Sequence, residues 1–234
     1  MFDIIAFDAD DTLWHNEAVY SETQDKVKKL LLQYQLEPEG IEQTLYEKDS
    51  GNVNYFGYGV KSFTLSMIEA AIELTEGKIS GQEIQQIINY AKEMLEAEVH
   101  LLDHVEDTLA ALSQSHDLMI ITKGDLLDQE LKVARSGLAD YFNSVEIVSE
   151  KTAGSYREIL ARRHLQPGRF LMVGNSLKSD ILPVLAIGAR AVYVPQALTW
   201  AYEVGMAPDE DQDGYFELEH LGQLPALVEQ LSRG

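Results

Sequence analysis

The sequence predicts an α/β protein with a parallel β-sheet and helices on both of its faces. Five short runs of apolar or β-branched residues indicate buried strands, and helical patterns separate the later runs. Strands and helices in alternation imply right-handed crossovers and a parallel sheet. One long interval, from residue 15 to about 100, breaks this alternation, because it holds several helical patterns and no convincing strand.

The expected strands are Ile4–Phe7, Leu118–Ile121, Val145–Val148, Phe170–Val173 and Ala191–Val194. The helices expected between the later strands are Leu126–Arg135, Tyr156–Arg163 and Leu177–Ile187. Residues 195–221 are expected to be irregular, and an amphipathic helix over Leu221–Leu231 closes the chain.

The interval after the first strand predicts an inserted helical bundle. Its expected helices are Glu17–Tyr34, Pro38–Lys48, Val60–Leu74 and Gly81–Ala97. These helices could instead simply cover the sheet, but one βα crossover does not need so many residues. We therefore expect a Rossmann-like three-layer α/β/α core from residues 1–14 and 100–234, and a helical domain from residues 15–99.

Composition narrows the classes of partner. The 234 residues carry a formal net charge of −21, from 39 acidic and 18 basic residues. A field of that sign repels nucleic acid and anionic membranes, so neither is an expected partner. The absence of cysteine excludes disulfides, thiolate catalysis and Cys-zinc sites. Without a signal-like N-terminus or an apolar run of membrane-spanning length, the expectation is a cytoplasmic monomer or homodimer.

Polar residues follow four of the expected strands. In chain order, they are Asp8 and Asp10, then Thr122-Lys123-Gly124, then Ser149-Glu150-Lys151, and finally Gly174-Asn175-Ser176 with Asp180 a turn further on. Ligands of open α/β sheets bind outside the carboxyl ends of the strands, so these side chains should converge at one edge. Carboxylates, a hydroxyl and an ammonium suit a divalent cation together with a phosphate.

The chemistry of phosphate transfer explains such a set. A carboxylate nucleophile and a phosphate dianion repel by about 4 kcal/mol at 4 Å and an effective dielectric of 20, which a metal ion offsets. Thr122, backbone N–H groups and Lys151 could hold the phosphoryl oxygens. A second carboxyl two residues after the nucleophile could protonate the leaving alcohol and then take a proton from water.

These motifs resemble those of the haloacid dehalogenase superfamily, specifically its Mg²⁺-dependent phosphatases with a helical cap inserted after the first motif. Asp8-Ala9-Asp10-Asp11-Thr12-Leu13 matches the first motif, D-x-D-x-T-L. Thr122 matches the second motif and Lys151 the third. Gly174-Asn175-Ser176-Leu177-Lys178-Ser179-Asp180 matches the fourth. The resemblance covers essentially the whole chain.

The resemblance implies roles for the first and fourth motifs. Asp8 would be the nucleophile that forms an aspartyl-phosphate, and Asp10 the general acid/base. Mg²⁺ would be held by the Asp8 side chain, the Asp10 backbone carbonyl and Asp180. Asn175 stands where Asp is frequent, and we expect it to reach the metal through water. Asp11 replaces the commoner Gly, and we interpret it as a turn residue.

The resemblance also implies that Asp8, Thr122 and Lys151 contact the phosphoryl group. Lys123 follows Thr122 where Asn is usual, so it is a further candidate phosphate contact.

The loop Asn52–Lys61 is expected to join two helices of the cap. In the resembling family, cap loops of this kind select the leaving group, which implies that Tyr55, Tyr58 and Lys61 contact the substrate. The alternative is that the aromatic residues pack within the cap.

The expected function is hydrolysis of a small phosphorylated metabolite, such as a nucleoside monophosphate or a sugar phosphate, by a phosphoric monoester hydrolase. A phosphomutase or phosphotransferase on the same scaffold is the alternative. A phosphoacceptor signalling module of receiver type is disfavoured, because its acceptor Asp follows an interior strand and its chain is shorter. A dehalogenase is disfavoured because that branch dispenses with the second Asp of the first motif, which is present here as Asp10.

Overall fold

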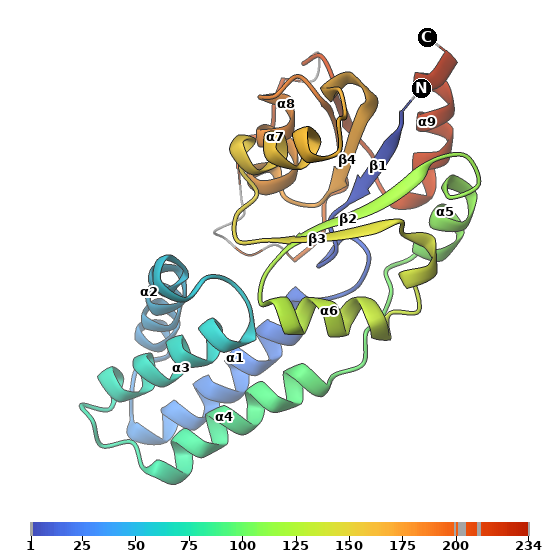
Figure 1. Cartoon of the computed structure of the whole chain (residues 1–234). Coiled ribbons are helices and arrows are strands. Elements are labelled where there is room, and N and C mark those ends of the chain that lie inside the picture. Colours follow the sequence, from blue (N-terminus) through green and yellow to red (C-terminus); the bar gives the residue numbers. More distant parts are fainter. Residues whose placement is uncertain (1, 199, 201–204, 210–211, 234) are drawn as a thin grey trace. The chain divides into compact units, whose positions relative to one another are not determined.

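The computed structural model describes residues 2–198, 200, 205–209 and 212–233. In this part of the chain, six parallel strands form one sheet in the order β3-β2-β1-β4-β5-β6, with helices packed on both faces (Figure 1). The predicted α/β class, with a parallel sheet and an inserted set of helices, is confirmed.

All five expected strands form, each with its ends within two residues of the predicted ones. The strands are β1 (Ile4–Phe7), β2 (Asp117–Lys123), β3 (Ser144–Val148), β4 (Phe170–Gly174), β5 (Arg190–Tyr193) and β6 (Tyr215–Glu217). The last of these lies in a stretch that was expected to be irregular, so that expectation was wrong. Among the described strands, β6 has three residues and pairs with β5 alone, and so short an edge strand has no periodicity of its own to read.

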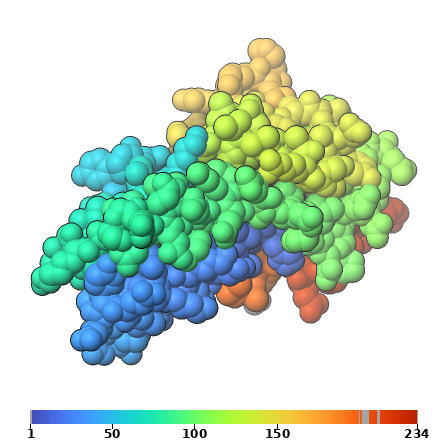
Figure 2. All heavy atoms as spheres, turned by 90° about the horizontal axis from the view of Figure 1, so that it is seen from below, coloured from blue at the N-terminus to red at the C-terminus, as the bar shows by residue number. Residues whose placement is uncertain are grey.

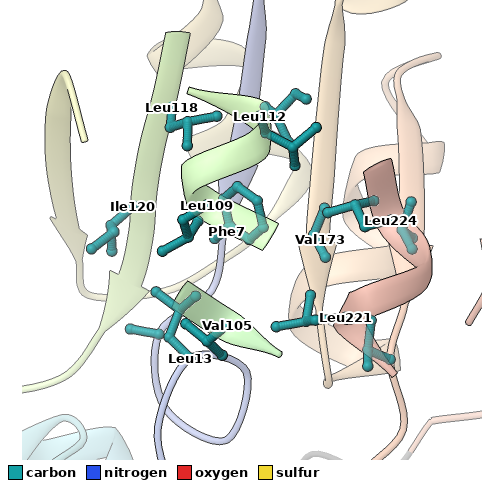
Figure 3. Close-up of a cluster of buried hydrophobic side chains, with 14 of the residues drawn as sticks. Phe7, Leu13, Val105, Leu109, Leu112, Leu118, Ile120, Val173, Leu221 and Leu224 are labelled. Atoms are coloured by element: carbon teal, nitrogen blue, oxygen red, sulfur yellow. The ribbon is translucent and has the colours of Figure 1, made fainter. Parts of the chain in front are cut away.

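Apolar side chains alternate between the two faces of the sheet, as the pleat of a strand requires. In β1, Ile5 and Phe7 join one buried cluster, whereas Ala6 joins the other. Figure 3 shows the first cluster, where residues of the sheet meet those of helices α5 (Val105–Leu112) and α9 (Leu224–Arg233). The second cluster packs on α7 (Ala153–Arg162) and α8 (Leu182–Leu185). Each strand of the centre is therefore buried on both sides, which fixes the register of its carboxyl end.

Among the remaining helices near the sheet, α6 has its expected bounds, and the others are short turns that were not predicted as separate helices. These helices are α6 (Leu126–Arg135), η2 (Ala139–Tyr141), η3 (Pro167–Arg169), η4 (Leu177–Ile181) and η6 (Leu221–Gln223). Helix α5 was not predicted. The helix expected over Leu177–Ile187 is instead the wide turn η4 followed by the single turn α8.

The inserted helices are α1 (Glu17–Leu31), η1 (Leu32–Tyr34), α2 (Pro38–Phe56), α3 (Val60–Leu74) and α4 (Gly81–Glu96). They enclose an apolar core of their own, to which all four long helices contribute. Helices α1 and α4 lie side by side on one face (Figure 2), where Lys26 pairs with Glu93 at 3.2 Å.

Helix α2 runs eight residues beyond its expected end, so most of the predicted loop Asn52–Lys61 is helical. The reason is tertiary: the Asn52 amide donates to Ser66 Oγ at 3.2 Å and to Glu69 Oε2 at 2.9 Å, both on α3. These contacts hold the last turns of α2 despite Gly51. Only Gly57-Tyr58-Gly59 remains as a connection, and both of its glycines have positive φ.

The chain divides into two compact units. The first comprises Met1–Glu17, Val99–Lys123 and Gln129–Gly234, and the second comprises Ala18–Glu98 and Gly124–Asp128. The second unit thus includes five residues after β2 that the sequence-based boundaries assign to the core. No helix in the described ranges combines the length and the apolar character that crossing a bilayer requires.

Candidate active site

The candidate residues of the first unit meet at the carboxyl ends of β1, β2 and β4. These strands are neighbours at the centre of the sheet, and the Asp8 N–H continues the ladder by donating to the Val173 carbonyl at 2.9 Å. Side chains that follow these strands therefore lie at one edge, as predicted for parallel strands.

Lys151 lies between two buried carboxylates. Its ammonium donates to Asp8 Oδ1 and, at 2.7 Å, to Asp180 Oδ1. The side chain of Lys151 is 1% exposed and that of Asp180 is fully buried. The third-motif lysine is thus in contact with residues of the first and fourth motifs, which are far apart in the sequence.

The electrostatics of this cluster show a shortage of positive charge. Burial raises the pKa of Asp8 to about 7; Lys151 acts in the opposite direction, and Asp180 and Asp10 raise the pKa further. Burial alone would lower the pKa of Lys151, but Asp180 and Asp8 raise it above its ordinary value. The lysine therefore stays protonated, and one ammonium faces two carboxylates.

The turn after Asp8 brings Thr12 back beside the nucleophile candidate. The backbone N–H groups of Thr12, Leu13 and Trp14 all point to the Ala9 carbonyl, at 3.2, 2.8 and 3.4 Å. The Thr12 hydroxyl lies 3.5 Å from Asp8 Oδ2 and donates to Asn175 Oδ1 at 3.2 Å. This hydroxyl joins the first motif to the fourth.

Asp11 supports the turn and does not face the cluster. Its φ is +57°, a region in which Asp is tolerated better than most residues. Its carboxylate accepts the backbone N–H of Asn16 at 2.8 Å and of Glu17 at 3.0 Å, which caps the start of α1. The interpretation of Asp11 as a turn residue is confirmed.

Gly174 makes room for Asp180. A Cβ on Gly174 would lie 2.3 Å from Asp180 Oδ2, so no larger residue fits while that carboxylate keeps its place. Asp180 Oδ2 also accepts the Ser176 N–H at 3.1 Å, and Ser176 Oγ accepts the Ser179 N–H at 3.0 Å. The wide turn η4 thus presents Asp180 toward Lys151.

The residues at the end of β2 are both engaged. Thr122, 1% exposed, donates its hydroxyl to Gln129 Oε1 at 3.3 Å. The Lys123 ammonium donates to Ser179 Oγ at 2.9 Å, beside Asp180. Both side chains stay within the candidate site, and their contact with a phosphoryl group stays a prediction.

Asp10 is surrounded by donors that the sequence did not single out for it. Trp14 Nε1 donates to its Oδ1 at 2.7 Å, Gln129 Nε2 to its Oδ2 at 2.8 Å, and Lys132 Nζ to the two oxygens at 3.1 and 3.2 Å. Gln129 and Lys132 belong to no motif. Their only sequence signal is their position three residues apart on α6, which puts two polar side chains on one helix face.

Tyr55, Tyr58 and Lys61 all belong to the second unit. Tyr55 is the last residue but one of α2 and is 81% exposed, and Tyr58 lies between the two connecting glycines. Lys61 is the second residue of α3 and pairs with Asp125 Oδ2 at 2.9 Å. Burial raises the pKa of Asp125, but this contact contributes to a net lowering. Their role in substrate selection stays a prediction.

The donors at this edge fit Mg²⁺. Asp8 and Asp180 supply carboxylate oxygens, Asn175 supplies an amide oxygen, and the raised pKa of Asp8 marks a place where a cation is favoured. Among the residues described, no group of three or more His, Cys, Asp or Glu side chains is placed to hold a metal ion. Two carboxylates would therefore need amide, backbone carbonyl or water oxygens to complete the site.

Comparison with known proteins decides the family. The family model of the haloacid dehalogenase-like hydrolases matches residues 2–188, which include every motif of the first unit. The chain belongs to this family. It is therefore a hydrolase of the haloacid dehalogenase type, and the resemblance read from the motifs is confirmed.

Individual relatives agree on the family and differ in reaction. A haloacid dehalogenase-like family hydrolase from Xanthomonas campestris is 38% identical, with a TM-score of 0.89 over 99% of this chain and 92% of that one. N-acylneuraminate-9-phosphatase of Mus musculus is 25% identical over 70% of this chain. That match spans 66% of the relative, just under two thirds of its length. A 2-haloacid dehalogenase from Pseudomonas syringae shares the fold, with 22% identity and a TM-score of 0.65 over 98% of this chain and 99% of that one.

Proposed function

We propose that this hydrolase is a Mg²⁺-dependent phosphomonoesterase that acts on small phosphorylated metabolites through an aspartyl-phosphate on Asp8. This proposal is based on the two carboxyl groups of the first motif, which have different environments. Asp8 is buried against Lys151, whereas Asp10, two residues on, is partly exposed and ringed by hydrogen-bond donors. One carboxyl suits attack and the other suits proton transfer.

In the first step, an Asp8 oxygen attacks phosphorus, and the bond from phosphorus to the leaving oxygen breaks. Asp10 gives its proton to that oxygen, so an alcohol departs. Lys151 and Thr122 bind the phosphoryl oxygens, on which negative charge is concentrated in the transition state. Mg²⁺, held by Asp8, Asp180 and the Asp10 carbonyl with Asn175 nearby, would offset the repulsion between carboxylate and phosphate.

In the second step, Asp10 takes a proton from water while the water oxygen attacks phosphorus. The bond between Asp8 and phosphorus breaks, which returns the Asp8 carboxylate and releases inorganic phosphate. Each step moves one proton through Asp10, so the residue ends the cycle as it began.

The carboxyl at position 10 also supports a phosphatase over a dehalogenase, because the dehalogenase branch dispenses with it. The sheet order β3-β2-β1-β4-β5-β6 differs from the flavodoxin-like order of receiver modules, in which the first strand does not hold the central position between the second and fourth. Similarity to a phosphatase of sugar-acid phosphates adds phosphorylated sugar acids to sugar phosphates and nucleoside monophosphates as substrate classes to screen.

The test is hydrolysis of p-nitrophenyl phosphate, followed by a panel of phosphorylated metabolites, with Mg²⁺ and with a chelator. We expect turnover that the chelator abolishes and that excess Mg²⁺ restores. Release of halide from a 2-chloroalkanoic acid, without hydrolysis of any phosphate ester, would contradict the proposal. Transfer of the phosphoryl group to a second hydroxyl instead of water would assign a phosphotransferase.

A further inference from the structure

The donors around Asp10 come from two segments that the sequence separates by more than 100 residues. Trp14 belongs to the turn after β1, whereas Gln129 and Lys132 belong to α6. Each of the two Asp10 carboxylate oxygens accepts from two different side chains. Contacts to both oxygens fix the rotation of the carboxyl group as well as its position.

The Gln129 amide can adopt only one orientation in this arrangement. Whenever the Asp10 carboxyl is ionised, its oxygens only accept, so the Gln129 NH₂ group then faces Asp10 and the amide oxygen faces Thr122. The Thr122 hydroxyl then donates to Gln129. A single side chain, 2% exposed, thereby joins the predicted proton-transfer residue to a predicted phosphoryl contact.

Lys132 is held in the same network from the other side. Its ammonium donates to Asn16 Oδ1 at 2.7 Å as well as to Asp10, and the Asn16 backbone is fixed by Asp11. Gln129 and Lys132 face the same way because residues three apart lie on one face of a helix.

The side chains of this network differ in burial, and Asp10 is more exposed than Trp14 and Gln129. Trp14 is 1% exposed and Gln129 2% exposed, whereas the Asp10 side chain keeps 22% of its surface open. A network that served only to join α6 to the turn would have no need to leave its central carboxylate accessible. Buried polar groups that are fully hydrogen-bonded hold an accessible group rigidly in place.

We propose that Gln129 and Lys132 are positioning residues that hold the Asp10 carboxyl at the place where it serves the leaving group. This inference rests on the proposed function, because it assigns the purpose of these residues within that reaction. Neither residue touches the reacting atoms. Both act through Asp10, and misplacing a reacting group by about 1 Å can cost about 100-fold in rate.

The test compares two substrates of similar shape, p-nitrophenyl phosphate and phenyl phosphate. Phenol is the more basic leaving group, so its departure depends more on a positioned acid. In Gln129→Met and Lys132→Met, kcat/KM for phenyl phosphate should fall about 10- to 100-fold, a part of the roughly 100- to 10,000-fold that general acid catalysis contributes. The fall for p-nitrophenyl phosphate should be several-fold smaller. Lys132→Arg, which keeps a donor, should recover part of the loss.

Glu130→Gln is the control on the same helix, because it removes a charge from α6 at a side chain that is exposed. It should leave the ratio of the two kcat/KM values at its wild-type level, and thermal melting should show all variants folded. An equal fall on both substrates would overturn the positioning role while leaving the phosphatase proposal intact. A gain with phenyl phosphate would also overturn it, because the contacts would then hold Asp10 out of place. If the wild type hydrolyses neither substrate, nor any ester of the metabolite panel, the proposed function fails and this inference fails with it.

Discussion

At the scale of single residues, the cluster around Lys151 depends on a glycine. Asp180 reaches the lysine because Gly174 carries no side chain, and the carboxylate lies where a Cβ would be. The G-[D/N]-S-x-x-x-D pattern therefore has a steric basis: the first residue of the motif provides the space that the last one fills.

Gly174→Ala should lower activity strongly and stability moderately. The added methyl group must displace the Asp180 carboxylate, and such overpacking costs about 1–3 kcal/mol of unfolding free energy. The carboxylate that moves is one that we propose holds Mg²⁺, so the Mg²⁺ concentration needed for half-maximal activity should rise. Both quantities are measured by denaturant titration and by kinetics against Mg²⁺.

Gly168→Ala is the control for this prediction, because a Cβ there meets no atom within 4 Å. It should leave the Mg²⁺ requirement unchanged. A Gly174→Ala protein with wild-type kinetics would show that the position of Asp180 does not matter for the reaction.

The sequence allowed most site residues to be named, because each follows a strand whose apolar run is visible. It could not indicate Gln129 and Lys132, whose importance comes from contacts with Asp10 across more than 100 residues. Polar residues on an amphipathic helix are normally exposed to solvent, and only the fold shows that this face of α6 meets the turn after β1.

At the scale of elements, the errors in prediction have one physical origin. Helix α2 extends past Gly51 because Asn52 bonds to α3, and β6 exists because β5 offers an edge. Local propensity predicted an α2 that was too short and did not predict β6 at all. In both cases, tertiary contacts overrode the local preference. Strands such as β1 were predicted to the residue because burial on both faces requires an unbroken apolar run.

Helix α2 also carries a half-buried carboxyl group in line with its buried residues. Asp49 lies four residues after the buried Leu45 and four before the buried Val53, so all three share one face. Burial raises the pKa of Asp49 to about 6 from an ordinary 3.8. The folded state therefore binds the proton more tightly than the unfolded chain does.

Asp49→Asn should stabilise the protein at neutral pH. With the folded pKa raised, ionisation destabilises the fold progressively from pH 3.8 to about 6 and fully above it. Removing that cost should raise the unfolding free energy at pH 8 by on the order of 1–3 kcal/mol, and by less at pH 5. Melting temperatures at the two pH values measure the difference.

Asp25→Asn, on exposed α1 surface of the same unit, is the matched control and should change little at either pH. If Asp49→Asn destabilised the protein equally at both pH values, the carboxylate would have to be making a favourable interaction, and burial would not be its dominant environment.

At the scale of the whole molecule, the net charge of −21 opposes the approach of a phosphate dianion. Among the described residues, the candidate site brings together the cations Lys151, Lys123 and Lys132. Salt screens the long-range field more than the short contacts, because the Debye length falls from about 30 Å at 0.01 M to about 8 Å at 0.15 M.

Raising ionic strength over that range, at fixed Mg²⁺, should therefore lower KM for a phosphate ester and leave kcat nearly unchanged. Steady-state kinetics with sodium chloride measure both. A KM that rises with salt would show that the cations of the site, and not the acidic surface, dominate the field that the substrate meets.

The proposed function requires that Asp8 becomes covalently phosphorylated during turnover. The most direct measurement is mass spectrometry of protein quenched with acid while it hydrolyses p-nitrophenyl phosphate in the presence of Mg²⁺. We expect one added phosphoryl group on the peptide that contains Asp8, and neither adduct nor hydrolysis in Asp8→Asn. Undiminished hydrolysis by Asp8→Asn, or a phosphoryl group on a different residue, would contradict it.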